Sequence, residues 1–296
     1  MSGFFDAPVV LHVGGGPVRL FRGGPVGAPP LLLLHGAMLD TGQGVWRRVA
    51  PALAEAYDVH VIDLPRHGGS RPWKGVLDDE RLGRLLEQLL DVLGLPRVGL
   101  LGLSMGAGLA TSFALRRPDR VSALLAIAPG GIEERRPAQL TTWMMLRTPG
   151  LLRACSWILA RFPGVVRRSM IGSLSAGERT PDLEQILGLA AQEARAKHVH
   201  GERALDDWQV EAYGPRRMRL NLLPLLPRLS VPTLWVRGGD DPLVADAVMR
   251  EAAAVVPGSR LVTIPDAGHI VTYDRPEEVI ALARGFLGAA LGRGST

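Results

Sequence analysis

The sequence predicts an α/β protein: a mostly parallel, doubly wound sheet, with helices on both faces and a further block of helices inserted into it. Short apolar runs typical of buried strands alternate with helical stretches over most of the chain, as in successive strand–helix–strand units. The alternation stops after residue 130 and resumes after residue 222. We therefore expect a core formed by residues 1–130 and 223–296, and a helical insertion at 131–222.

Composition fits one large globular unit. The 296 residues are 47% hydrophobic and 21% charged, which is enough for a full core. No apolar stretch reaches the roughly 18 residues that span a bilayer, and residues 1–6 do not begin a secretory signal. The single cysteine, Cys155, agrees with a reducing compartment, so we expect a cytoplasmic protein.

The net charge of +5 raises the question of a nucleic-acid partner. The arginines are scattered in ones and twos, often beside acids, and no run of Lys and Arg approaches a binding patch. We therefore expect no nucleic-acid partner and no stable insertion into a membrane. The sequence leaves the oligomeric state open.

The first hundred residues are expected to form a hairpin, two buried strands and two helices. The glycines at 14–16 form the turn of the hairpin, since no helix follows them as a phosphate loop requires. The expected elements are strands at 9–13 and 18–22, a strand entered at Pro29 and ended at His35, a helix at 45–56, a strand at 59–62 and an amphipathic helix at 79–93.

The strongest chemical signal lies between an apolar strand and a helix, at Gly102-Leu103-Ser104-Met105-Gly106. The G-x-S-x-G spacing suits a sharp strand-to-helix turn that raises a serine hydroxyl above the sheet. Glycines two residues before and two after the serine let strand and helix approach without a Cβ clash. The alternative is a glycine-rich turn with a solvated serine, because 36 glycines make the bare pattern common.

Two later strands are followed by groups that could activate a serine, which needs a base and a group that orients the base. Asp240 and Asp241 follow a strand at 233–236, and His269 follows a strand at 260–264. Taken alone, each aspartate could cap a turn and the histidine could sit in a loop. The other expected elements are a strand at 121–128 and helices at 107–117, 245–255 and 276–291.

Together these motifs resemble the α/β-hydrolase-fold serine hydrolases, and the resemblance covers essentially the whole chain. It rests on short motifs at five places in the sequence. These are His35-Gly36 with Trp46 downstream, the run from Asp63 to Ser70, the Ser104 turn, the run from Gly238 to Val244, and Gly268-His269 followed by Pro276-Glu277-Glu278-Val279.

The resemblance implies a role for each matching position. Ser104 is expected to be the nucleophile, His269 the general base and Asp241 the acid that orients it, because the family aspartate lies third after the glycine. The backbone N–H groups of Ala37 and Met105 are expected to form the oxyanion hole. His35 and His67 are expected to hold loops.

The insertion matches the cap of that family, which roofs the site. From the cap we expect Trp143, Met144 and Trp157 to contribute to an apolar substrate pocket, although packing within the cap explains most of its apolar residues. The floor residues of the expected pocket are Met38, Leu39, Ile270 and Val271. Such a pocket would suit a bulky neutral acyl or alcohol group.

The expected activity is hydrolysis of a carboxylic ester of a small to medium apolar substrate, with no cofactor and no metal. His198 and His200 have no third ligand nearby in the sequence. Carbon–carbon bond hydrolase, lactonase, cofactor-free haloperoxidase and non-catalytic binder of a small molecule stay as alternatives. The resemblance counts modestly against the first, because Leu103 replaces the asparagine typical before its serine and no tryptophan follows His269.

Overall fold

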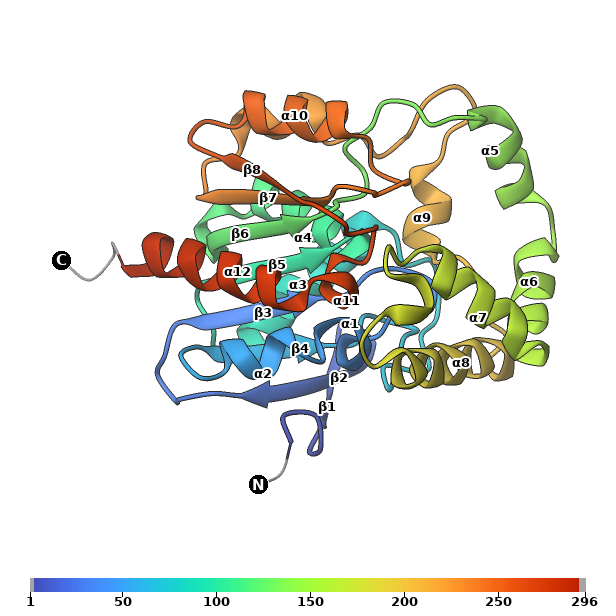
Figure 1. The fold of residues 1–296 in the computed structure, drawn as a ribbon, viewed down its shortest axis with the longest axis horizontal. Helices are drawn as coiled ribbons and strands as arrows, with labels where there is room; N and C mark the ends of the chain where they lie inside the picture. Colours follow the sequence, from blue (N-terminus) through green and yellow to red (C-terminus); the bar gives the residue numbers. More distant parts are fainter. Residues whose placement is uncertain (1–2, 293–296) are drawn as a thin grey trace.

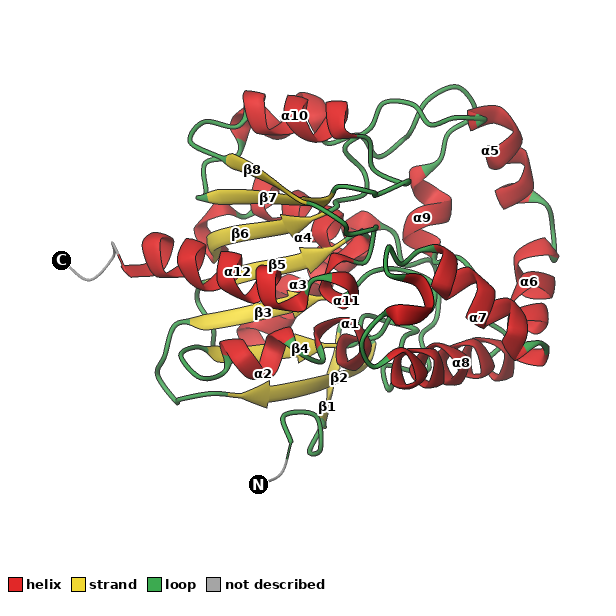
Figure 2. Ribbon diagram, viewed as in Figure 1, coloured by secondary structure: helices red, strands yellow, loops and turns green. Residues whose placement is uncertain are grey.

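A computed structural model describes residues 3–292 of the chain and holds an eight-stranded sheet (Figures 1 and 2). The strand order is β1-β2-β4-β3-β5-β6-β7-β8; β2 pairs antiparallel with both β1 and β4, and strands β3 to β8 are parallel to one another. The strands are β1 (Val9–Val13), β2 (Gly16–Gly23), β3 (Pro30–Leu34), β4 (Asp58–Ile62), β5 (Val98–Leu103), β6 (Val121–Ile127), β7 (Thr233–Gly238) and β8 (Arg260–Ile264).

The central strands are apolar along their whole length because both faces of the sheet are covered. Leu31 to Leu34 in β3 have no exposed surface, and every residue of β5 is buried. Helices α3 (Asp79–Val92) and α4 (Met105–Arg116) pack together, and α4 contacts β5 and β6. On the opposite face, α12 (Pro276–Leu291) contacts β6 and α2 (Val49–Leu53). Helix α10 (Asp246–Val255) contacts β7, β8 and the short 3-10 helix at Leu223–Arg228, which also contacts α4, so α10 lies on the same face as α4.

Five α-helices lie between β6 and β7 in the chain and sit beyond the carboxyl ends of the parallel strands (Figure 1). We call them the inserted helices: α5 (Gln139–Arg147), α6 (Leu151–Arg161), α7 (Pro163–Gly172), α8 (Leu183–Val199) and α9 (Asp207–Ala212). All five fall within 131–222, the segment that the sequence marks as an insertion. The division of the chain into domains at those boundaries stays a prediction.

The fold class expected from the sequence is confirmed, with differences in short helices. The single helix expected at 45–56 is two, α1 (Gly42–Trp46) and α2. Pro51 explains the break, because it has no N–H to donate and its ring would meet the carbonyl of Arg47 in a continuous helix. A one-turn helix, α11 (Val271–Asp274), is too short for a periodic pattern to predict.

Within residues 3–292, no helix combines the length and the apolar run that crossing a membrane requires.

Candidate active site

Ser104 forms the junction between β5 and α4. Its backbone has φ 52° and ψ −113°, a left-handed conformation that is strained for a residue with a Cβ. The Ser104 N–H donates to the carbonyl of Ile127 at 2.9 Å, and its own carbonyl accepts from Gly108 and Gly130 at 2.9 and 3.0 Å. These three hydrogen bonds fix the strained turn, which presents the serine at the end of the strand.

The two glycines around the serine are required by close backbone contacts. A Cβ on Gly102 would lie 2.5 Å from the backbone of Ala107. A Cβ on Gly106 would lie 2.4 Å from the carbonyl oxygens of Leu34 and His35. Since Cβ atoms do not approach other atoms so closely, only glycine fits at either position without a shift of the backbone.

His269 joins Ser104 to Asp241. The imidazole Nε2 lies 2.9 Å from Oγ of Ser104, and Nδ1 lies 3.0 Å from Oδ2 of Asp241. Because a carboxylate only accepts hydrogen bonds, Nδ1 carries the ring proton and donates it, which leaves Nε2 to accept from the Ser104 hydroxyl. The arrangement can deprotonate the serine during attack on a carbonyl carbon.

Asp241 is buried and held by its own turn. Its Oδ1 accepts the N–H groups of Leu243 at 2.7 Å and Val244 at 3.2 Å. Burial by itself would raise the pKa of Asp241, but the hydrogen bond and charge of His269 and the two amides outweigh it and lower the pKa. The carboxylate of Asp240 lies elsewhere, exposed, and accepts from the hydroxyl of Ser175 at 3.0 Å.

Two backbone amides near the serine are free to donate. The N–H groups of Ala37, which follows β3, and of Met105, the first residue of α4, have no acceptor among the described residues. The N-terminus of α4 also carries a partial positive charge. By contrast, the N–H of Met38 donates to Oδ2 of Asp206 at 2.7 Å, so it is already engaged.

The residues expected in the pocket have different surroundings. Trp143 is partly buried, and its Nε1 is buried with no partner in the described chain. Of the four residues expected from the core, Met38 is partly buried, and Leu39, Ile270 and Val271 are buried. Val271 lies completely buried in the hydrophobic core. Met144 and Trp157 are both about half exposed, and the Trp157 ring packs edge-to-face on Phe162 at 6.0 Å. The composition of the pocket stays a prediction.

The two histidines expected to hold loops, His35 and His67, make structural contacts. His35 accepts the N–H of Leu64 at its Nε2, 2.9 Å away, and burial lowers its pKa well below the ordinary value, so the ring is neutral. His67 lies 2.8 Å through Nδ1 from the carbonyl of Asp40 and 3.0 Å through Nε2 from Oδ1 of Asp206. Neither ring reaches Ser104 by a hydrogen bond.

Two acidic residues near the site are not indicated by any sequence pattern. Asp40 is buried, and in the described chain its carboxyl group has no hydrogen-bond or ion-pair partner. A Cβ built on Gly36 would lie 2.2 Å from Oδ2 of Asp40 and 3.5 Å from Cβ of Ser104, so both side chains lie against Gly36. Burial raises the pKa of Asp40 to about 7.

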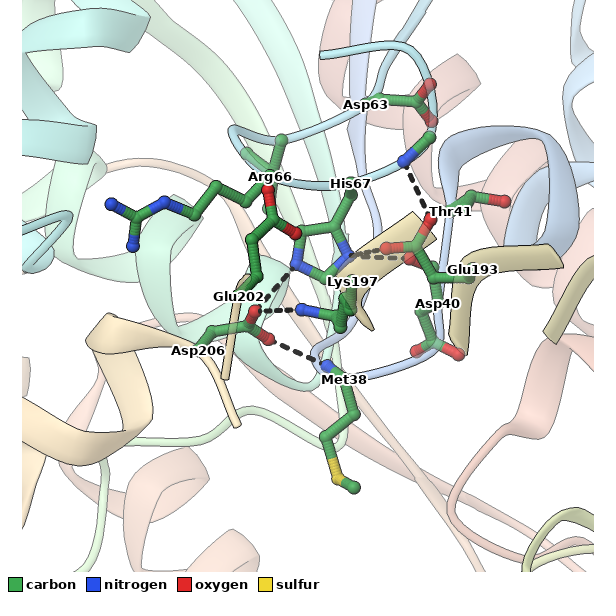
Figure 3. A network of polar contacts seen from close by, with 12 residues as sticks. Met38, Asp40, Thr41, Asp63, Arg66, His67, Glu193, Lys197, Glu202 and Asp206 are labelled. Carbon is green, nitrogen blue, oxygen red and sulfur yellow. Dashed lines mark hydrogen bonds and ion pairs between the residues drawn. The ribbon is translucent and has the colours of Figure 1, made fainter. Parts of the chain in front are cut away.

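Asp206 is the second such residue. It stands in the loop before α9 and contacts Met38, His67 and Lys197, as Figure 3 shows. An Asp-Asp pair before a helix is an ordinary capping signal, so the sequence gives no reason to connect it with a loop 168 residues earlier. Among the described residues, no group of three His, Cys, Asp or Glu side chains is arranged to hold a metal ion.

Comparison with known proteins identifies the family. A sequence profile described as the alpha/beta hydrolase fold matches residues 29–276, which is most of the chain. The protein therefore belongs to the alpha/beta hydrolase fold family. With esterases and other hydrolases among its relatives, it is a hydrolase.

Three relatives illustrate the range of activities. A pimeloyl-[acyl-carrier protein] methyl ester esterase from Aeromonas hydrophila is 29% identical over 273 residues, covering 88% of this chain and 96% of the relative. A 2-hydroxy-6-oxononadienedioate/2-hydroxy-6-oxononatrienedioate hydrolase from Cupriavidus pinatubonensis is 29% identical over 270 residues, covering 88% of each. The solved structure of a thermophilic esterase from Thermogutta terrifontis matches with a TM-score of 0.76 and 27% identity, covering 96% of this chain and 99% of that one.

Proposed function

We propose that the protein hydrolyses carboxylic esters through a covalent acyl-enzyme on Ser104. The observation that carries this proposal is the hydrogen-bonded series Asp241–His269–Ser104, which ends at a serine in a strained strand-to-helix turn. A serine without that partner would be too weak a nucleophile at neutral pH. The esterases among the relatives support the same activity.

The reaction proceeds in two halves. Ser104 Oγ attacks the ester carbonyl while its proton passes to Nε2 of His269, and the resulting oxyanion is stabilised by the N–H groups of Ala37 and Met105. The intermediate collapses, the alcohol leaves with the proton from His269, and the acyl group stays on Ser104. Water then gives a proton to His269 and attacks the acyl carbonyl, the acid is released, and Ser104 recovers its proton.

The proposed substrate is a small to medium apolar ester. The bulky side chains expected around the site, including Trp143 and Met38, favour a neutral acyl or alcohol group. Neither a cofactor nor a nucleic-acid partner enters the proposal. We propose the cytoplasm as the compartment, on the single cysteine, Cys155.

The test uses purified protein and a panel of p-nitrophenyl esters, lactones and a carbon–carbon bond substrate. We expect turnover of the esters, labelling of Ser104 by a fluorophosphonate probe located by peptide mapping, and loss of both in Ser104→Ala. Turnover or labelling that survives this substitution would contradict the assignment. Turnover of lactones or carbon–carbon substrates well above esters would replace the substrate class, and binding without turnover would favour the small-molecule binder.

A further inference from the structure

The loop at residues 37–40, which carries the Ala37 amide, is held at both ends by one buried cluster. Near its start, the Met38 N–H donates to Oδ2 of Asp206 at 2.7 Å. At its end, the carbonyl of Asp40 accepts from Nδ1 of His67 at 2.8 Å. Nε2 of His67 lies 3.0 Å from Oδ1 of Asp206, so one histidine and one carboxylate connect the two ends (Figure 3).

The hydrogen bonds define the charges in this cluster. Both partners of the His67 ring, a backbone carbonyl and a carboxylate, accept hydrogen bonds. Each ring nitrogen must therefore carry a proton, and His67 is a cation. Lys197, from α8, donates to the same Oδ1 of Asp206 at 2.7 Å and is 1% exposed. Asp206 thus accepts from His67, from Lys197 and from the Met38 amide, and its side chain also caps the start of α9 by accepting from the backbone of Gln209.

These contacts keep Asp206 ionised. Burial alone would raise its pKa, but the charges and hydrogen bonds of His67 and Lys197 outweigh burial and hold the pKa well below the ordinary value. A carboxylate is a stronger acceptor than a neutral group, so its bond to the Met38 amide is one of the strong, charge-assisted kind. The Met38 amide therefore has a fixed position.

Met38 needs such a restraint. Its φ is 63°, in the left-handed region that a residue with a Cβ rarely adopts, so the loop would relax without an anchor. Its peptide nitrogen and the carbonyl of Ala37 form one planar unit, which is joined through the Ala37 Cα to the unit that carries the Ala37 N–H. Relaxation of the backbone at Met38 would therefore also displace the Ala37 amide. A displacement of about 1 Å at such a donor is enough to lower a rate by on the order of 100-fold.

We propose that Asp206 is a positioning residue for the oxyanion-binding loop, acting through the Met38 amide. The inference rests on the proposed function, in which Ala37 donates to the oxyanion. Asp206 belongs to the inserted segment, whereas the loop that it holds belongs to the core. The inserted segment therefore contributes to stabilising the transition state as well as to covering the substrate.

The experiment compares Asp206→Ser with a matched control, Asp207→Ser. Serine keeps a side chain suited to the start of α9 but is too short to reach Met38. Asp207 is the adjacent buried carboxylate, and it contacts Arg66 at 2.6 Å and the Leu77 amide at 3.0 Å without touching the 37–40 loop. Both variants therefore lose one carboxylate from the same turn, and only Asp206→Ser loses the contact with the 37–40 loop.

Each variant is assayed on one p-nitrophenyl ester, with rates normalised to active sites titrated to completion with a fluorophosphonate. We expect Asp206→Ser to lower kcat about 10- to 100-fold, part of the loss seen when one oxyanion donor is removed, with KM within about threefold. We expect Asp207→Ser to keep kcat within about threefold. A trifluoromethyl ketone forms a tetrahedral adduct with the serine. Its affinity should fall by about the same factor as kcat/KM in Asp206→Ser and should stay unchanged in Asp207→Ser.

An unchanged kcat in Asp206→Ser, a rise in KM alone, or equal losses in both variants would overturn the inference. If Asp206→Ser does not fold, Asp206→Asn takes its place. The asparagine oxygen can still accept from Met38, but its NH₂ group faces the donors His67 and Lys197, so we expect a smaller loss of kcat than in Asp206→Ser. Ser104→Ala separates the two levels of the argument. Activity that survives in Ser104→Ala overturns the proposed function and the inference with it. If Ser104→Ala is inactive but the Asp206 variants keep the wild-type kcat, only the inference is overturned.

Discussion

Oδ2 of Asp241 lies 3.0 Å from Nδ1 of His269, while the next carboxylate along the chain, that of Asp240, accepts from Ser175 and stays exposed. The turn after β7 therefore separates two adjacent aspartates into different surroundings. One is buried and held by the amides of Leu243 and Val244, and the other faces solvent.

This separation predicts opposite results for two isosteric substitutions. Asp241→Asn should lower kcat by about 10⁴, because an amide can hold His269 in the tautomer whose Nε2 is already protonated. Asp240→Asn should stay within several-fold of the wild type, since it changes an exposed group. The measurement is kcat of both folded variants on one ester. A dead Asp240→Asn with an active Asp241→Asn would reverse the assignment, and two active variants would place the acid elsewhere.

Gly106→Ala tests the close packing behind Ser104. The added Cβ would meet the carbonyl oxygens of Leu34 and His35 at 2.4 Å, so the free energy of unfolding should fall by about 1–3 kcal/mol or more. Gly188→Ala is the control, because Gly188 lies in α8 with open space around its Cβ position. It should raise the free energy of unfolding by up to about 1 kcal/mol. Urea unfolding gives both values, and equal effects would contradict the packing described.

Asp40 predicts a dependence of stability on pH. The pKa of Asp40 is about 7 in the folded protein and about 3.9 in the unfolded chain, so protonation of this carboxyl group stabilises the folded state. That contribution is complete below about pH 4 and is lost as the pH rises through 7. Asparagine cannot ionise, so the free energy of unfolding of Asp40→Asn should rise relative to that of the wild type by on the order of 2 kcal/mol between pH 5 and pH 8.

Urea unfolding at several pH values measures that difference. Asp240→Asn, which changes an exposed carboxylate, serves as the control and should show a difference from the wild type that is nearly independent of pH. A constant difference for Asp40→Asn as well would mean that the buried carboxyl group keeps an ordinary pKa.

The length of the acyl chain should govern specificity. Each methylene buried in an apolar pocket contributes roughly 0.8 kcal/mol, or about fourfold in kcat/KM, until the pocket is full. We therefore expect kcat/KM to rise from p-nitrophenyl acetate through butyrate to hexanoate. A flat or falling series would refute the apolar pocket and favour a small or polar acyl group.

Much of the fold follows from local sequence. Buried parallel strands need continuous apolar runs, so the four leucines at 31–34 predict β3 directly. The turn at Ser104 is similarly local, because the backbone contacts of Gly102 and Gly106 require glycine whatever lies further away. Pro51 also contained the signal for the break between α1 and α2, although the apolar periodicity of 45–56 favours one helix.

The features that the sequence did not predict depend on contacts between segments that are far apart in the chain. Nothing near Asp206 indicates that it reaches Met38, since the contact forms only when the chain returns across the carboxyl ends of the strands. The orientation of the inserted helices has the same origin. Apolar residues at helical spacing show that α6 has an apolar face, but Trp157 and Phe162 could equally face the site or each other.

The bond between Asp206 and Met38 also bears on protein engineering. Exchanging the roof of one hydrolase for that of another is a natural route to new substrates, and it treats the two parts as separable modules. In this protein a chimera that replaces the segment containing Asp206 would lose the acceptor for the Met38 amide unless the donor segment supplies one. Such a chimera would accept its new substrate and still react slowly, and restoring a carboxylate at that single place is the repair we would make first.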